Sequence, residues 1–367
     1  MKPYSKTYSK QSIGLGDIYA VIKTLVSPYL TNGPAIEKVE NEIAEYVGAK
    51  YCIMVSNGTA GLNLLAKMLP KSRVHVPDIT FMATANAFDL EGHDVVLEDV
   101  EEDKPFLPKK NYLKLPFTDN KDNTIVIPVH MMGHPVINLD RYGDVTIIED
   151  ACHALGASYY DTEGKQMVGN CKYSLATVFS FHPVKPITSG EGGAITTNDE
   201  ALYDELKSLR SHGISITIDG KYELETPSLN FRMTDIQASL LSSQLKKLDK
   251  FTEKRTELAE EYSKILPRSV IPTHLCTERP SWHLYSIRVS QYRDELRYFL
   301  KNRGIATQIH YQPLHTLKYY HDKLDSNNRY PNANKYHKET LSLPLYPSMS
   351  KKDVKHIANK VLEFWQL

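Results

Sequence analysis

The chain has 367 residues, 41% of them apolar, and its 44 lysine and arginine residues balance 44 aspartate and glutamate residues. This balance argues against nucleic acid and anionic membrane surfaces as partners, because both require clustered positive charge. No stretch approaches the roughly 18–20 apolar residues that cross a bilayer, and the N-terminus lacks the apolar core of a secretion signal. The four cysteines show no CxxC spacing, which favours reduced thiols and no zinc site. We therefore expect a cytoplasmic protein, and its length predicts two domains.

The first part of the sequence has the pattern of an α/β protein. Helices are expected over residues 17–26 and 36–46, separated by an Asn-Gly-Pro turn. Short apolar runs then alternate with helical or loop segments, and several are apolar at consecutive positions. Such runs are typical of a mostly parallel sheet that helices cover on both faces. The expected strands are 51–56, 73–79, 95–100, 125–131, 145–151, 176–181 and 194–197.

The last part predicts a smaller α+β unit. Helical periodicity covers residues 234–265, interrupted only by a lysine-rich patch. Beyond it we expect strands over 282–289 and 305–311, and helices over 291–303 and 351–365. We therefore assign residues 1–240 to a large domain that includes the N-terminal helices, and residues 241–367 to a small C-terminal domain.

Lys185 stands in an unusual loop between two predicted buried strands, Phe-Ser-Phe-His-Pro-Val-Lys-Pro-Ile-Thr followed by Ser-Gly-Glu-Gly-Gly. Most lysines lie on solvated faces, because burying an unpaired ammonium group is costly. Desolvation lowers the pKa of a lysine and frees the neutral amine that a Schiff base requires. The alternative is a loop lysine whose neighbours are apolar by chance, and this segment alone does not separate the two.

The turn that contains Gly58 and Thr59 is a candidate phosphate site. It joins a predicted strand to the start of an apolar helix in the segment Ser-Asn-Gly-Thr-Ala-Gly-Leu. Backbone N–H groups and the dipole at such a helix N-terminus bind phosphate, and Thr59 adds a hydroxyl. The alternative is a turn whose glycine and threonine serve only backbone geometry and capping.

Two further segments follow predicted strands. Glu149 and Asp150 end one strand, and His153 lies three residues on. A carboxylate at this edge of an α/β sheet could pair with the protonated ring nitrogen of pyridoxal phosphate, although Asp150 could equally cap a helix. Phe81 follows another strand and could stack on a planar cofactor or belong to the core. Together with the phosphate turn and the lysine, these residues are the parts of a pyridoxal phosphate site.

The sequence resembles the sugar aminotransferases of the DegT/DnrJ/StrS family, which have the fold-type-I, aspartate aminotransferase architecture. The resemblance covers nearly the whole chain. It rests on the Ser-Asn-Gly-Thr-Ala turn, Glu-Asp-Ala followed by His-Ala-Leu-Gly-Ala, the lysine loop, Arg-Ser-His-Gly at 210–213 and Leu-Asn-Phe-Arg-Met-Thr-Asp-Ile-Gln-Ala at 229–238. One departure is the short segment between Gly133 and Ile147, which leaves room for little more than a turn where the family has a crossover helix.

The resemblance implies roles for individual residues. Lys185 would be the Schiff-base lysine and Asp150 the partner of the pyridine nitrogen. Phe81 would stack on the ring. The residues implied to hold the phosphate are Gly58, Thr59 and Ser180. Asn230 would reach the phosphate of the neighbouring subunit's cofactor, which implies a homodimer.

The resemblance also bears on the substrate. Many members have glutamine at the position of His153, and histidine there resembles the branch that aminates a UDP-linked 4-keto-6-deoxy-N-acetylhexosamine on the way to pseudaminic acid. Candidate substrate residues are Thr31, His182, His310 and Tyr311. Turn capping is the alternative for Thr31, and strand-end packing is the alternative for Tyr311.

The function that the resemblance implies is transfer of the amino group of L-glutamate to C4 of a nucleotide-linked 4-keto-6-deoxy sugar. Lys185 would anchor the cofactor and act as acid and base. The alternatives are the same chemistry on a GDP- or dTDP-linked keto sugar or a small keto phosphate, and a noncatalytic regulator with this fold. A dehydratase branch lacks the anchoring lysine, so the presence of Lys185 argues against it.

Overall fold

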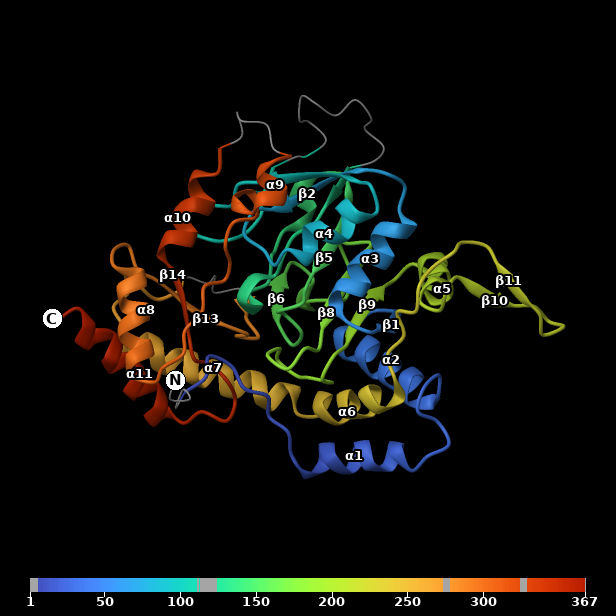
Figure 1. Cartoon of the computed structure of the whole chain (residues 1–367), viewed down its shortest axis with the longest axis horizontal. Helices are drawn as coiled ribbons and strands as arrows, with labels where there is room; N and C mark the ends of the chain where they lie inside the picture. Colours follow the sequence, from blue (N-terminus) through green and yellow to red (C-terminus); the bar gives the residue numbers. More distant parts are fainter. Residues whose placement is uncertain (1–5, 111, 113–123, 273–277, 324–328, 367) are drawn as a thin grey trace.

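A computed structural model describes residues 6–110, 112, 124–272, 278–323 and 329–366. A central sheet is enclosed by helices, and a smaller group of helices and short strands lies beside it (Figure 1). Within the described ranges, no helix combines the length and the apolar character needed to span a membrane. Cys52, Cys152 and Cys171 are free thiols. Cys276 lies outside the described residues.

The central sheet has seven strands in the order β1-β9-β8-β5-β4-β2-β3. Strand β9 runs antiparallel to both of its neighbours, and the remaining pairs are parallel. This arrangement confirms the predicted α/β fold with a mostly parallel sheet. The strands are β1 (Tyr51–Val55), β2 (Arg73–Pro77), β3 (Asp94–Glu98), β4 (Thr124–Val126), β5 (Thr146–Asp150), β8 (Ala176–Ser180) and β9 (Gly193–Thr197).

Eleven α-helices are described, and most lie where helical periodicity predicts them. They are α1 (Leu15–Leu25), α2 (Pro34–Val47), α3 (Gly58–Met68), α4 (Ala83–Leu90), α5 (Glu200–Leu209), α6 (Asp235–Leu245), α7 (Leu248–Ile265), α8 (Arg293–Asn302), α9 (Lys318–His321), α10 (Pro331–Glu339) and α11 (Lys351–Phe364). The expected helical stretch after residue 234 is thus two helices, divided at the lysine-rich patch. Between β4 and β5 the chain forms only the 3-10 turns η2 (Met131–Gly133) and η3 (Leu139–Tyr142), as the short sequence there predicts.

The predicted strand over residues 305–311 is wrong. Only Ile305 and Gln308 make isolated bridges there, and Gln308 exchanges backbone hydrogen bonds with Ser342. The edge of β13 (Tyr285–Arg288) is instead occupied by β14 (Thr340–Leu343), whose hydroxyl-rich sequence Thr-Leu-Ser-Leu gave no strand prediction. After Gln308 the chain turns towards the cavity described below.

Two hairpins were not predicted. Strands β6 (Ser158–Asp161) and β7 (Gly164–Met167) form the first, and β12 (Glu278–Arg279) joins its edge. Strands β10 (Ile214–Ile216) and β11 (Tyr222–Leu224) form the second, which projects from the body on the side away from α8 and α11 (Figure 1). Both are short and rich in polar residues, so neither shows the apolar runs that identify the central strands.

The buried side chains form separate cores. Two cores surround the central sheet, and the third is built from α7, α8, α11, β13 and β14. The N-terminal segment contacts this third group, where the N–H of Lys6 donates to the carbonyl of Gly304 at 3.1 Å. The division into residues 1–240 and 241–367 stays a prediction.

Candidate active site

A cavity of about 780 Å³ opens at the carboxyl ends of β1, β2, β5 and β8. Ligands of α/β proteins bind at this edge, because the loops after the parallel strands converge there. All but two of the predicted site residues line it. These residues are Gly58, Thr59, Phe81, Asp150, His153, Ser180, His182, Lys185, His310 and Tyr311.

Gly58 is the first residue of α3 and is closely surrounded by other atoms. The side chain of Asn57 caps the helix by accepting the N–H of Ala60 at 2.8 Å. A Cβ atom on Gly58 would lie 2.8 Å from Sγ of Cys152 and 3.3 Å from a backbone oxygen, so a larger residue would displace these neighbours. The first N–H groups of a helix lack intrahelical acceptors and attract anions. With the hydroxyl groups of Thr59 and Ser180 in the same wall, this corner suits a phosphate group.

Asp150 ends β5 and is 5% exposed. Its carboxylate accepts the hydroxyl of Thr84 at 2.7 Å and the N–H of Cys152 at 3.1 Å. No lysine, arginine or histidine in the described ranges forms an ion pair with it. A buried carboxylate with two donors and no ion-pair partner can accept a further N–H, which is the requirement for holding a protonated ring nitrogen.

Lys185 lies in the loop after β8, in a turn closed by its N–H and the carbonyl of His182 at 2.9 Å. Burial lowers the pKa of its ammonium group, and the nearby Cys152 and Asp150 oppose that shift. A lowered pKa increases the fraction of neutral amine, so the structure supports the nucleophilic character that the sequence predicts.

His153 and Tyr311 form a hydrogen-bonded pair across the cavity wall. The N–H of Met132 donates to Nδ1 of His153 at 3.2 Å, so the ring proton lies on Nε2 and faces the Tyr311 hydroxyl at 3.2 Å. Phe81 lies beside them, with its ring centroid 5.8 Å from that of Tyr311, and is 51% exposed. An exposed aromatic ring at this position can stack on a planar ligand.

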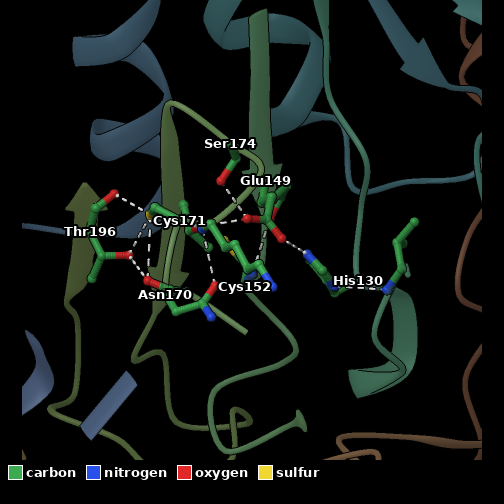
Figure 2. A network of polar contacts seen from close by, with 12 residues as sticks. His130, Glu149, Cys152, Asn170, Cys171, Ser174 and Thr196 are labelled. Carbon is green, nitrogen blue, oxygen red and sulfur yellow. Dashed lines mark hydrogen bonds and ion pairs between the residues drawn. The ribbon is translucent and has the colours of Figure 1, made fainter. Parts of the chain in front are cut away.

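Glu149 points to the opposite face of β5 from Asp150 and belongs to a buried polar network. Figure 2 shows its carboxylate between Ser174 and His130. It accepts Nε2–H of His130 at 2.7 Å and the hydroxyls of Ser174 and Thr177 at 2.5 and 3.0 Å. Burial would raise the pKa of Glu149, but these donors outweigh burial and lower it. The network therefore holds a charged carboxylate away from the cavity and anchors the strand that presents Asp150.

Thr31 and Asn230 lie outside this cavity. Both are exposed, and each makes an isolated backbone bridge, Thr31 to Thr234 and Asn230 to Ser211. The side chain of Asn230 accepts the N–H of Arg232 at 3.1 Å. Their predicted roles stay predictions.

Several polar residues of the cavity wall were not predicted from the sequence, among them Thr84, His283 and Tyr8. Thr84 holds Asp150, and its place in the segment after β2 could have indicated it. His283 and Tyr8 also line the cavity. Nothing in their local sequence indicates a site, because folding alone brings them to it.

The cavity histidines predict how folding stability depends on pH. Burial, with the charge of Lys185, lowers the pKa of His153, His283 and His310, that of His310 to about 3 from 6.5. Below pH 6.5 the unfolded chain binds protons that the folded chain does not, so the free energy of unfolding falls as pH decreases. The loss is about 1.4 kcal/mol per pH unit for each proton.

Urea unfolding at about pH 7, 6 and 5 checks this dependence. We expect His310→Asn to reduce the slope by one proton, and His321→Asn, whose side chain is 75% exposed, to leave it unchanged. A free energy of unfolding that is constant from pH 6.5 to 5 would contradict the prediction.

The residues of the cavity fit pyridoxal phosphate. The corner at Gly58 suits its phosphate, and the carboxylate of Asp150, which has no ion-pair partner, suits its ring nitrogen. Lys185, with its lowered pKa, suits its aldehyde. The fold and the cavity are those expected of a pyridoxal phosphate enzyme. Comparison with known proteins narrows this class. The DegT/DnrJ/EryC1/StrS aminotransferase family matches residues 12–362, and the chain belongs to that family of sugar aminotransferases.

Individual relatives match over almost their full length. The spore coat polysaccharide biosynthesis protein SpsC of Bacillus subtilis is 34% identical, over 96% of this chain and 95% of the relative. The UDP-4-amino-4,6-dideoxy-N-acetyl-beta-L-altrosamine transaminase of Campylobacter jejuni is 33% identical over the same shares.

Solved structures of aminotransferases are also similar to this chain over almost its full length. Helicobacter pylori PseC, an aminotransferase involved in the biosynthesis of pseudoaminic acid, has a TM-score of 0.90 and 29% identity over 98% of this chain and 99% of that structure. The putative sugar aminotransferase Spr1654 of Streptococcus pneumoniae in its PLP form has a TM-score of 0.86 and 26% identity over 98% of both chains. The same protein is also solved in its PMP form.

Proposed function

We propose that this sugar aminotransferase transfers the amino group of L-glutamate to C4 of a UDP-linked 4-keto-6-deoxy-N-acetylhexosamine. The observation that carries the proposal is the placement of Lys185, with its lowered pKa, in one cavity with the unpaired carboxylate of Asp150. The substrate is supported by the names of the Campylobacter and Helicobacter relatives and by the histidine at position 153.

Each residue of the cavity has a separate role in the proposed reaction. Pyridoxal phosphate, when bound, supplies an aldehyde that condenses with amines and a ring that accepts electrons. Lys185 would hold it and, once displaced by the amino donor, its Nζ would take the proton from Cα of L-glutamate. Asp150 would keep the ring nitrogen protonated, and the α3 N-terminus with Thr59 and Ser180 would hold the phosphate. Phe81 and His153 would orient the ring.

A panel of acceptors tests the substrate. We expect the protein, loaded with pyridoxal phosphate, to form 2-oxoglutarate from L-glutamate with the UDP-linked keto sugar at higher kcat/KM than with GDP- or dTDP-linked keto sugars or small keto phosphates. A higher kcat/KM with one of those acceptors would contradict the UDP sugar. A protein that binds the cofactor but reacts with none of them would favour a noncatalytic regulator.

We also propose that the active unit is a homodimer in which Asn230 serves the neighbouring site. Asn230 is exposed and does not line the cavity of its own chain. Helix α1 is anchored to the body through Asp17, whose carboxylate accepts hydrogen bonds from Ser243 and Gln244. Several of its apolar residues face outward, with Leu15 86% and Tyr19 69% exposed. Apolar side chains of the projecting β10–β11 hairpin are exposed as well. A second copy would cover these surfaces.

Mixing two inactive variants tests this dimer. Lys185→Ala and Asn230→Ala homodimers should each have low activity. After subunit exchange, a mixed dimer would pair the intact Lys185 of one chain with the intact Asn230 of the other, so we expect up to half of the sites in each mixed dimer to recover activity. No recovery after exchange confirmed by mass spectrometry would contradict a shared site.

A further inference from the structure

His283 is an imidazole in the cavity wall for which no role is predicted above. It is 2% exposed, and its ring centroid lies 4.4 Å from that of His153. Neither of its ring nitrogens has a hydrogen-bond partner among the described residues, and Nδ1 is fully enclosed. Leaving a buried polar group without a partner costs free energy, so such a group in a ligand cavity needs an explanation.

The backbone around His283 is held firmly. The guanidinium group of Arg255, itself 1% exposed, donates to the carbonyls of Trp282, His283 and Leu345 at 3.2, 3.3 and 2.8 Å. Ser281 donates its N–H to Gly133 and its hydroxyl to the carbonyl of His153, each at 3.0 Å. These bonds join the segment before β13 to the turn after β5 that carries His153. The imidazole is therefore preorganised rather than loosely placed.

The surroundings of His283 keep its ring uncharged. Burial lowers its pKa well below the ordinary value, and His153, Lys185, Arg255 and His310 add to the shift. A neutral imidazole offers one N–H donor and one lone pair, which matches a hydroxyl or carbonyl oxygen. A carboxylate would be better served by a cation.

We propose that His283, through Nε2, contacts an uncharged oxygen, hydroxyl or carbonyl, of the keto sugar and sets the affinity for that substrate but not for the amino donor. This inference rests on the proposed function. The two carboxylates of L-glutamate make it the poorer match for a neutral ring, whereas a hexose presents several uncharged oxygens.

The two half-reactions, followed separately by the absorbance of the bound cofactor, test this role. His283→Phe retains a planar ring against His153 but removes both nitrogens, and His283→Gln restores a donor and an acceptor. We expect His283→Phe to raise the half-saturating concentration of the UDP-linked keto sugar about 3- to 10-fold, with the L-glutamate half-reaction changed less than about twofold. His283→Gln should recover part of the loss. Calorimetric titration with the aminated UDP sugar should show the same order of dissociation constants.

Several outcomes would overturn the proposal. An equal or larger loss in the L-glutamate half-reaction would assign His283 to the amino donor or to the integrity of the cavity. Unchanged half-reactions and unchanged binding in His283→Phe would show that it contacts neither substrate. His321→Phe, at a position whose side chain is 75% exposed, serves as the control for histidine replacement. A wild-type protein that reacts with L-glutamate but with no UDP sugar would contradict the proposed substrate itself.

Discussion

Lys185→Ala is expected to remove the absorption band near the visible edge that wild-type protein shows with pyridoxal phosphate, and to lower the transamination rate by about 10²- to 10⁴-fold or more. The reason is that Nζ of Lys185 is proposed both to hold the cofactor and to move the proton at Cα. Absorption spectra and steady-state rates of the purified variant check both parts.

The control for this experiment is Lys165→Ala, which removes an exposed lysine of the β6–β7 hairpin. It should keep both the band and the rate. A colourless wild type, even after pyridoxal phosphate is added, would contradict the role of Lys185. So would an unchanged band in Lys185→Ala.

Asp150→Asn is expected to lower kcat by about 10²- to 10³-fold while the protein still folds, because asparagine retains the shape and the contact with Thr84 but not the charge. Without that charge the ring nitrogen is protonated less, and the ring accepts electrons less well. Single-turnover rates with L-glutamate measure the effect directly.

Glu149 supplies a matched control, since it lies one residue away on the other face of β5. Glu149→Gln should lower the free energy of unfolding by about 1–3 kcal/mol, because an amide cannot accept all the donors that face this position. Its rate per folded molecule should fall far less than that of Asp150→Asn. Equal losses of rate in the two variants would contradict a specific role for Asp150.

The central sheet was predictable because several of its strands are continuous apolar runs, such as Ile125-Val126-Ile127, between helical segments. The strand predicted over residues 305–311 failed for a physical reason. Apolar and aromatic residues there indicate a strand, but the hydrogen bonds of β13 go to β14, and Tyr311 turns to meet His153. Local composition cannot show which of two segments occupies a sheet edge.

The site was predictable where its residues follow strands in recognisable segments. Lys185, Asp150, Gly58 and Phe81 all do so, and they line one cavity. His283 could not be found in this way. Its place depends on the hydrogen bond that its backbone carbonyl accepts from Arg255, which lies on a helix nearly thirty residues earlier. Its environment, rather than its sequence, identifies it.

The adjacent acids of β5 have a consequence for folding fidelity. If β5 paired one residue out of register, every side chain would change faces. Glu149 would leave its three donors for the cavity, and Asp150, with a shorter side chain, would face His130 and Ser174 in its place. A mispaired sheet would then bury a poorly solvated charge, which costs several kcal/mol. The two neighbouring acids thus make a one-residue shift of the strand that carries Asp150 energetically unfavourable.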